Sequence, residues 1–183
     1  MILGLLLGIV AVFAAKYIRK YEWASYILAL ALAITLFVVD NQHLLAEFAI
    51  GFFLVVMYAG VFTSKSKVGK GLRGVRKQYA IMGTVFGLIH GLYYIFDGQL
   101  EWAGIISLVA ILPLTYTSFI FARKRMTNKS WKLLHKLSYV VYAGLFAHMM
   151  LLGEYPYALA FGIYFIMKAF YEFRKVRYNK VTA

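Results

Sequence analysis

Four histidines are the side chains of this sequence best suited to chemistry. The 183 residues contain no cysteine, which excludes disulfides, thiolate metal sites and iron–sulfur clusters held by cysteine. His90, His135 and His148 fall within long apolar stretches, whereas His43 stands close to Asp40 at the edge of one. An ionisable residue inside such a stretch is costly and is therefore a candidate for a functional site. For any one of these histidines alone, a structural hydrogen bond between helices is an equally good interpretation.

His90 and His148 form the strongest pair. If their two apolar stretches are helices that cross a membrane in the same direction, both histidines lie toward the outer ends of those helices. Neutral imidazole is a good ligand for iron, and two imidazoles from facing helices can bind one haem from both sides. We therefore predict that His90 and His148 ligate the iron of a haem b, with nearby Phe, Leu and Met side chains excluding water.

His135 lacks an obvious partner. It precedes His148 by about 20 Å along a helix axis, at 1.5 Å per residue. At the matching depth of the other helix the sequence has Arg76 and Lys77, and neither is a plausible iron ligand. Three interpretations of His135 stay open: an unusual second-haem ligand, a contact to a haem propionate or a quinone, or a structural residue. Arg76 is a candidate contact for a haem propionate or a flavin phosphate, and His43 is interpreted as an interfacial loop residue.

The composition indicates the elements that must position these side chains. The chain is 63% hydrophobic and 15% charged, whereas a soluble domain is about 45–50% apolar and about 25% charged. A backbone in lipid must satisfy its own hydrogen bonds, so long apolar runs there are helices. The sequence therefore predicts an all-α, polytopic membrane bundle that forms a single domain over residues 1–183. Seven transmembrane helices are expected, at residues 2–15, 23–39, 44–62, 79–96, 102–122, 133–152 and 155–173.

The basic residues predict how this bundle is oriented. All 20 Lys and Arg residues fall at alternate connections or in the C-terminal tail. The positive-inside rule then places the N-terminus outside and the C-terminus in the cytoplasm. The same pattern explains the net charge of +13 without a nucleic-acid partner. The first stretch is interpreted as an anchor rather than a signal peptide, because its positive charges follow the apolar run. Pro113 is expected to kink the fifth helix, and Pro156 to lie harmlessly near the start of the seventh.

Local motifs around these histidines resemble one known family. The run Trp131-Lys-Leu-Leu-His135-Lys-Leu-Ser-Tyr139, followed by His148 and preceded two spans earlier by a single His90, resembles the ferric reductase-like transmembrane domain. The stretch from Gly104 through Pro113 to Ser118 is similar to the fifth span of its MsrQ-type branch, the haem-binding membrane subunits of the periplasmic methionine-sulfoxide reductase system. The resemblance covers a core of about residues 44–173.

The resemblance implies a function in electron transfer. Relatives with two stacked b haems carry two histidines on each of two helices. Here His135 and His148 match one helix, His90 matches the outer ligand of the other, and Arg76 stands where the inner ligand would be. This three-histidine arrangement is that of the MsrQ-type branch. It implies a multi-pass protein of the bacterial inner membrane that carries electrons from a cytoplasmic flavin reductase or membrane quinol to an extracytoplasmic reductase subunit. FMN or a quinone is a further cofactor candidate.

Two other functions are compatible with the sequence. One is a haem-free membrane scaffold or small transporter. The other is a direct reductase of ferric chelates, in which acidic residues at the outer connections contact the iron. These residues are Asp40, Glu47, Asp97, Glu101 and Glu154, and they are also the expected counterpart of a positive inner face.

Overall fold

The computed structural model describes residues 2–63, 65–99 and 101–181, with side chains as far as residue 173. Every regular element in these ranges is a helix, which confirms the all-α prediction. The elements are α1 (Ile2–Lys20), α2 (Glu22–Val38), α3 (Gln42–Tyr58), α4 (Lys67–Phe96), α5 (Trp102–Tyr116), α6 (Ile120–Arg123), α7 (Asn128–Leu134), the 3₁₀ turn η1 (His135–Leu137), α8 (Ser138–Leu151) and α9 (Tyr155–Val181).

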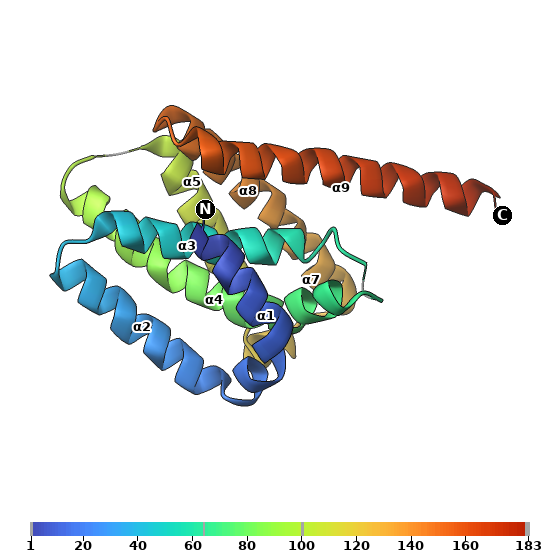
Figure 1. Cartoon of the computed structure of the whole chain (residues 1–183), viewed down its shortest axis with the longest axis horizontal. Helices are drawn as coiled ribbons and strands as arrows, with labels where there is room; N and C mark the ends of the chain where they lie inside the picture. The colour runs from blue at the N-terminus through green and yellow to red at the C-terminus, as the bar shows by residue number, and fades with distance from the viewer. Residues whose placement is uncertain (1, 64, 100, 182–183) are drawn as a thin grey trace.

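The long helix α4 organises the bundle. It packs against α1, α2, α3 and α5, while α8 lies between α5 and α9. Figure 1 shows α9 running along one side and continuing past the body of the bundle. Helices α4 and α8 thus belong to neighbouring parts of one bundle, and α5 contacts both.

Small residues and buried polar groups join the helices. A Cβ on Gly71 of α4 would lie 2.5 Å from Val12 Cα of α1, so only glycine allows this close approach. The Tyr79 hydroxyl donates to Leu7 O at 3.1 Å, and the Tyr58 hydroxyl donates to Ala160 O at 2.8 Å. Close contacts through small residues and hydrogen bonds between helices are typical of helix packing in membranes.

The helix boundaries differ from the predicted spans in several places. Helix α4 begins at Lys67 rather than at residue 79, α3 ends at Tyr58 rather than at residue 62, and α1 and α9 continue to Lys20 and Val181.

The fifth span is interrupted, because α5 ends at Tyr116 and α6 begins only at Ile120. Pro113 lies in the last turn of α5, and the hydroxyls of Thr117 and Ser118 donate to backbone carbonyls one turn back, at 2.7 Å each. These bonds compete with a continued helix, so the predicted single span is divided soon after the proline. Pro156 lies in the first turn of α9, as predicted.

The sixth span is also interrupted. It comprises the end of α7, the turn η1 and α8, and His135 is the first residue of the turn. Among the described residues, two helices are long and apolar enough to cross a membrane, α1 and α4. Helices α2, α3 and α5 are apolar but shorter. Seven crossings with an outside N-terminus therefore remain a prediction.

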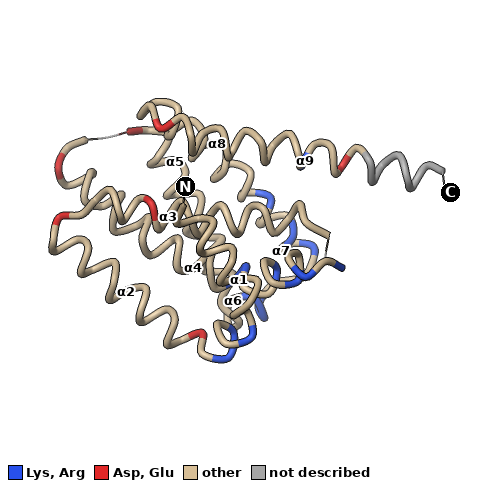
Figure 2. The backbone as a smooth tube through the Cα atoms, viewed as in Figure 1, with Lys and Arg blue, Asp and Glu red and all other residues tan. Residues whose placement is uncertain are grey.

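Large apolar side chains cover much of the outer surface. Examples are Leu5 and Phe13 on α1, Leu28 on α2, Val109 on α5 and Ile166 on α9, each more than half exposed. Charges gather instead at the two ends of the bundle, as Figure 2 shows. Lys and Arg lie around α6, α7 and the α1–α2 turn, and most acids lie at the opposite end. The side chains of the basic residues after position 173 lie outside the described part of the chain.

Candidate functional site

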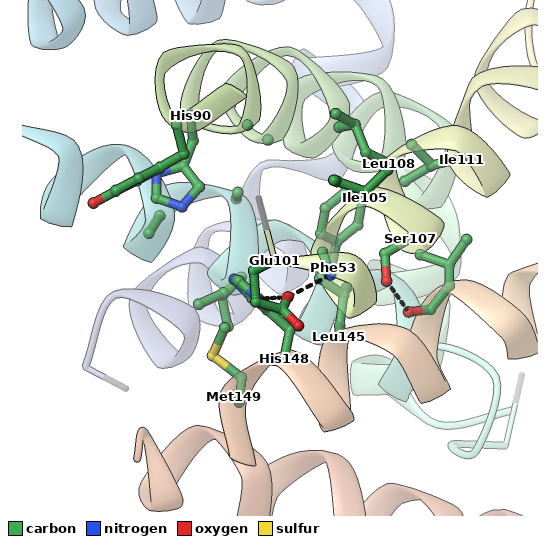
Figure 3. A pocket seen from close by; sticks show the side chains of 18 of the residues that line it. Phe53, His90, Glu101, Ile105, Ser107, Leu108, Ile111, Leu145, His148 and Met149 are labelled. Atoms are coloured by element: carbon green, nitrogen blue, oxygen red, sulfur yellow. Dashed lines mark hydrogen bonds and ion pairs between the residues drawn. The ribbon is translucent and has the colours of Figure 1, made fainter. Parts of the chain in front are cut away.

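A cavity of about 470 Å³ opens among α3, α4, α5 and α8. His90 of α4 and His148 of α8 both line it, and Figure 3 shows the two rings at the same hollow. The structure thus brings together the two histidines that the sequence paired. Ligand sites are typically concave, mainly apolar and about 300–1,000 Å³ in volume, so this cavity has the size of a cofactor site.

His148 is held in place by a carboxylate. Its Nδ1 lies 2.5 Å from Glu101 Oε2. The same carboxylate accepts hydrogen bonds from the backbone amides of Ala103 at 3.0 Å and Gly104 at 2.7 Å, at the start of α5. A Cβ on Gly104 would lie 3.2 Å from both Cε1 and Nδ1 of His148. Because Gly104 has no side chain, the imidazole of His148 can pack closely against the backbone at the start of α5.

The hydrogen bonds of Glu101 favour its charged form. Burial raises the pKa of this carboxyl, but the bonds from the Gly104 and Ala103 amides and from His148 outweigh burial, and the pKa lies below its ordinary value. An ionised carboxylate can only accept hydrogen bonds. Each oxygen of Glu101 already accepts a backbone amide, so His148 Nδ1 is the donor in this pair. In the neutral ring this arrangement leaves the lone pair on Nε2.

His90 is held less firmly. Its Nδ1 is buried without a hydrogen-bond partner of normal geometry among the described residues, although a hydrogen-bond interaction with the backbone of Gln42 acts on the ring. The ring stands edge-on to Tyr94, with 4.9 Å between the ring centroids. His90 therefore has a neutral backbone group beside it, where His148 has a carboxylate.

The remaining wall of the cavity suits a flat, apolar macrocycle. Phe53, Leu108, Leu145 and Met149 line it, and these side chains exclude water and lower the local dielectric constant. Within the described ranges, no group of three His, Cys, Asp or Glu side chains could hold a bare metal ion. A haem needs only the two imidazoles, so the donor set and the apolar wall fit haem better than a free metal.

His135 lies apart from this cavity, near the basic end of the bundle. Its ring packs on Trp131 with 4.0 Å between centroids, and the charges of Arg76 and Arg123 act on it electrostatically. Its Nε2 lies 3.4 Å from Thr117 Oγ1, a hydroxyl that donates its proton to Pro113 O at 2.7 Å. Because that hydroxyl donates to a carbonyl, it can accept from His135 Nε2 when the ring is the Nε2–H tautomer.

Of the other sequence candidates, Arg76 is exposed near His135, and His43 is exposed in the first turn of α3. Two of the acids expected at the outer connections have local partners. Glu47 accepts from the Tyr157 hydroxyl at 2.5 Å, and Asp97 accepts from the Gln99 amide at 2.7 Å. Neither forms a cluster with the histidines.

Sequence reasoning missed the roles of Glu101 and Gly104 beside His148. Glu101 was considered only as one of several scattered outer acids. A signal was available, since Glu101 immediately precedes the apolar run that becomes α5, where a side-chain acceptor can cap the helix. Nothing in the sequence connects that cap to a histidine 47 positions later; the pairing depends on α5 packing against α8.

Comparisons with known proteins give a limited context. No protein-family profile matches the chain, and no solved structure matches it. A protein from Treponema pallidum (strain Nichols), described as an uncharacterized protein, is 27% identical over an alignment of 155 residues. The alignment covers 72% of this chain and 43% of that relative, so the chain spans less than half of the relative's length.

Proposed function

We propose that this chain is a membrane protein that binds one haem b between His90 and His148 and carries electrons across the bilayer. The observation that carries the proposal is the shared cavity, into which α4 and α8 each bring one imidazole. The rings come from different helices, as ligation from two sides requires. When bound, haem supplies a one-electron redox couple in a site shielded from water.

The exposed surface supports a place in the membrane. Large apolar side chains face outward on α1, α2, α5 and α9, where water would make them costly and lipid tails would not. The separation of basic and acidic side chains to opposite ends (Figure 2) matches a bundle whose basic end faces the cytoplasm. Both features support a membrane location. The bacterial inner membrane and the seven spans belong to the proposal and come from the sequence pattern and the family resemblance.

Each end of the bundle has a distinct part in this proposal. The cavity lies toward the acidic, outer end, close to an extracytoplasmic reductase subunit that would accept electrons. The basic end would receive them from a membrane quinol or a cytoplasmic flavin reductase. It carries a shallow cleft of about 540 Å³ lined by Lys16, Arg19, Lys65, Lys67 and Lys70, whose charges would attract an anionic donor.

The region of His135 is our candidate for the inner relay. Arg76 and Arg123 surround it with positive charge, which suits a haem propionate, a flavin phosphate or a reduced quinone. His135 lies outside the cavity that His90 and His148 share and stands among positive charges, so we assign it no second haem. This distribution of histidines is the one expected for the MsrQ-type branch of the ferric reductase-like transmembrane domain, and we propose membership of that branch.

Direct reduction of ferric chelates has less support. Glu101 is engaged with His148 and two amides, and Glu47 is bonded to Tyr157. These carboxylates are therefore occupied within the protein and are poor candidates for a shared iron site at the surface.

The test is a visible spectrum of the purified protein from haem-replete cells, oxidised and then reduced with dithionite, with haem counted per chain. We expect a Soret band, an α-band that sharpens on reduction, and one haem per polypeptide. A colourless protein would contradict the proposal and favour a haem-free scaffold or transporter. Two haems per chain would contradict the assignment of His135.

A further inference from the structure

The N-terminus of α5 fixes Glu101 at three points. Oε1 accepts from the Ala103 amide, and Oε2 accepts from both the Gly104 amide and His148 Nδ1, as described above. The partial positive charge at the start of a helix favours a carboxylate there. Glu101 thus caps α5 and at the same time bonds to a histidine on α8, and Figure 3 shows these contacts beside the cavity. Capping of α5 requires only the two bonds from the backbone amides, so the bond to His148 is additional.

We propose that Glu101 is a positioning residue that fixes His148 as the Nδ1–H tautomer and makes its Nε2 the stronger of the two iron ligands. The inference rests on the haem site proposed above. A ligating histidine whose other nitrogen donates to a carboxylate is held in one ring orientation and becomes more basic. His148 has such a partner, whereas His90 Nδ1 has no hydrogen-bond partner of normal geometry in the described structure.

Unequal ligands have a consequence for the redox couple. A more electron-rich imidazole stabilises ferric iron more than ferrous iron, which lowers the reduction potential. A low potential favours the release of an electron to the next acceptor. The contact between Glu101 and His148 would therefore make the reduced haem a stronger electron donor, although Glu101 itself touches neither iron nor substrate.

The first experiment measures the tautomer without haem. The full-length protein, labelled with ¹⁵N-histidine and purified haem-free in detergent micelles, gives ring nitrogen shifts that distinguish Nδ1–H from Nε2–H. We assign the His148 signal by its loss in His148→Gln. We expect the Nδ1–H form in the native protein and a mixture of tautomers in Glu101→Ala. An Nε2–H form in the native protein would overturn the inference, whatever the haem content.

The second experiment measures the midpoint potential of the haem-loaded protein. Glu101→Gln keeps the size of the side chain and removes its charge, and Glu154→Gln is the matched control at the same end of the bundle. We expect the potential to rise in Glu101→Gln and to stay unchanged in Glu154→Gln. Each tenfold loss in the preference for ferric iron corresponds to about 59 mV for a one-electron couple.

The outcomes separate this inference from the proposed function. A native protein with one haem, whose potential is the same in Glu101→Gln and Glu154→Gln, would overturn the role of Glu101 and leave the haem site intact. A native protein that never binds haem would overturn the proposed function, while the tautomer experiment would still test the pairing of Glu101 with His148. If Glu101→Gln loses its haem during purification, the contact between Glu101 and His148 also contributes to haem affinity. The expected affinity is then roughly 10–100-fold weaker than in the native protein.

Discussion

His148 and His135 belong to the same predicted apolar span, residues 133–152, yet have opposite surroundings. His148 faces a cavity, and a carboxylate at 2.5 Å holds its Nδ1. His135 packs against Trp131, bonds to Thr117 and is surrounded by two arginine charges. A negative partner strengthens an imidazole as a ligand, and a positive environment weakens it. The comparison shows that two histidines of one apolar stretch can differ in both space and partner: His148 has a cavity and a carboxylate, whereas His135 has neither.

The sharpest test of this contrast replaces the cavity histidines. We expect His90→Ala and His148→Ala each to abolish stable haem binding, because the iron loses one of its two protein ligands. His43→Ala, an exposed position, is the control and should bind haem as the native protein does. Haem per polypeptide, measured after purification, decides the matter. Full haem content in both cavity variants would remove the ligand assignment.

Replacing the inner histidine should have a different effect. We expect His135→Ala to keep the haem and its spectrum but to slow haem reduction by a quinol or flavin donor. Stopped-flow absorbance at the Soret band measures that rate, and dithionite reduction serves as the control, since it bypasses a specific donor site. Loss of all haem in this variant would make the two histidines equivalent and would contradict the comparison.

A glycine tests whether space at the outer site matters. In Gly104→Ala the new Cβ would lie 3.2 Å from the His148 ring and from Glu101 Oε2, so both must shift. We expect weaker haem retention even though alanine favours a helix over glycine by about 1 kcal/mol. Gly162→Ala on α9 is the control, because its Cβ would meet Phe146 at an ordinary 3.8 Å. Equal haem dissociation rates in the two variants would show that the ring tolerates displacement.

The smallest effect is expected at the basic end, where Glu22 joins α2 to α4. Its carboxylate lies 2.7 Å from Lys77 Nζ and accepts from Gln78. The hydrogen bond from Lys77 is the main reason that the pKa of Glu22 lies below 4.5, with burial opposing it. A lowered pKa stabilises the fold above pH 4.5, and this contribution fades as the pH falls through the folded-state value. Glu22→Gln should cost about 1 kcal/mol or less.

Thermal melting at pH 7 and at pH 3 measures that contribution. The native protein should lose more stability than Glu22→Gln between the two pH values. An equal loss would mean that the pair contributes nothing to the acid sensitivity of the fold, and it would leave the haem site unaffected.

Part of this molecule could be predicted from residue order alone. The apolar runs gave the helical class and the approximate position of each long helix, because hydrophobic content and length act locally. The sequence pairing of His90 with His148 also agrees with the shared cavity. The breaks after Pro113 and at His135 were not predicted, since they depend on hydroxyl-to-carbonyl bonds and on a 3₁₀ turn within otherwise apolar runs.

By itself, the sequence determined the elements: all-helical, apolar on the outside, basic at alternate connections, with histidines in three of the apolar stretches. Only the tertiary structure decided how those histidines differ. Glu101 and Gly104 lie beside His148 because α5 packs against α8, and His135 lies instead beside Trp131, Thr117 and two arginine charges. Helix formation depends on neighbours in the chain, whereas the charge, space and proton position around an imidazole depend on residues that only folding brings together.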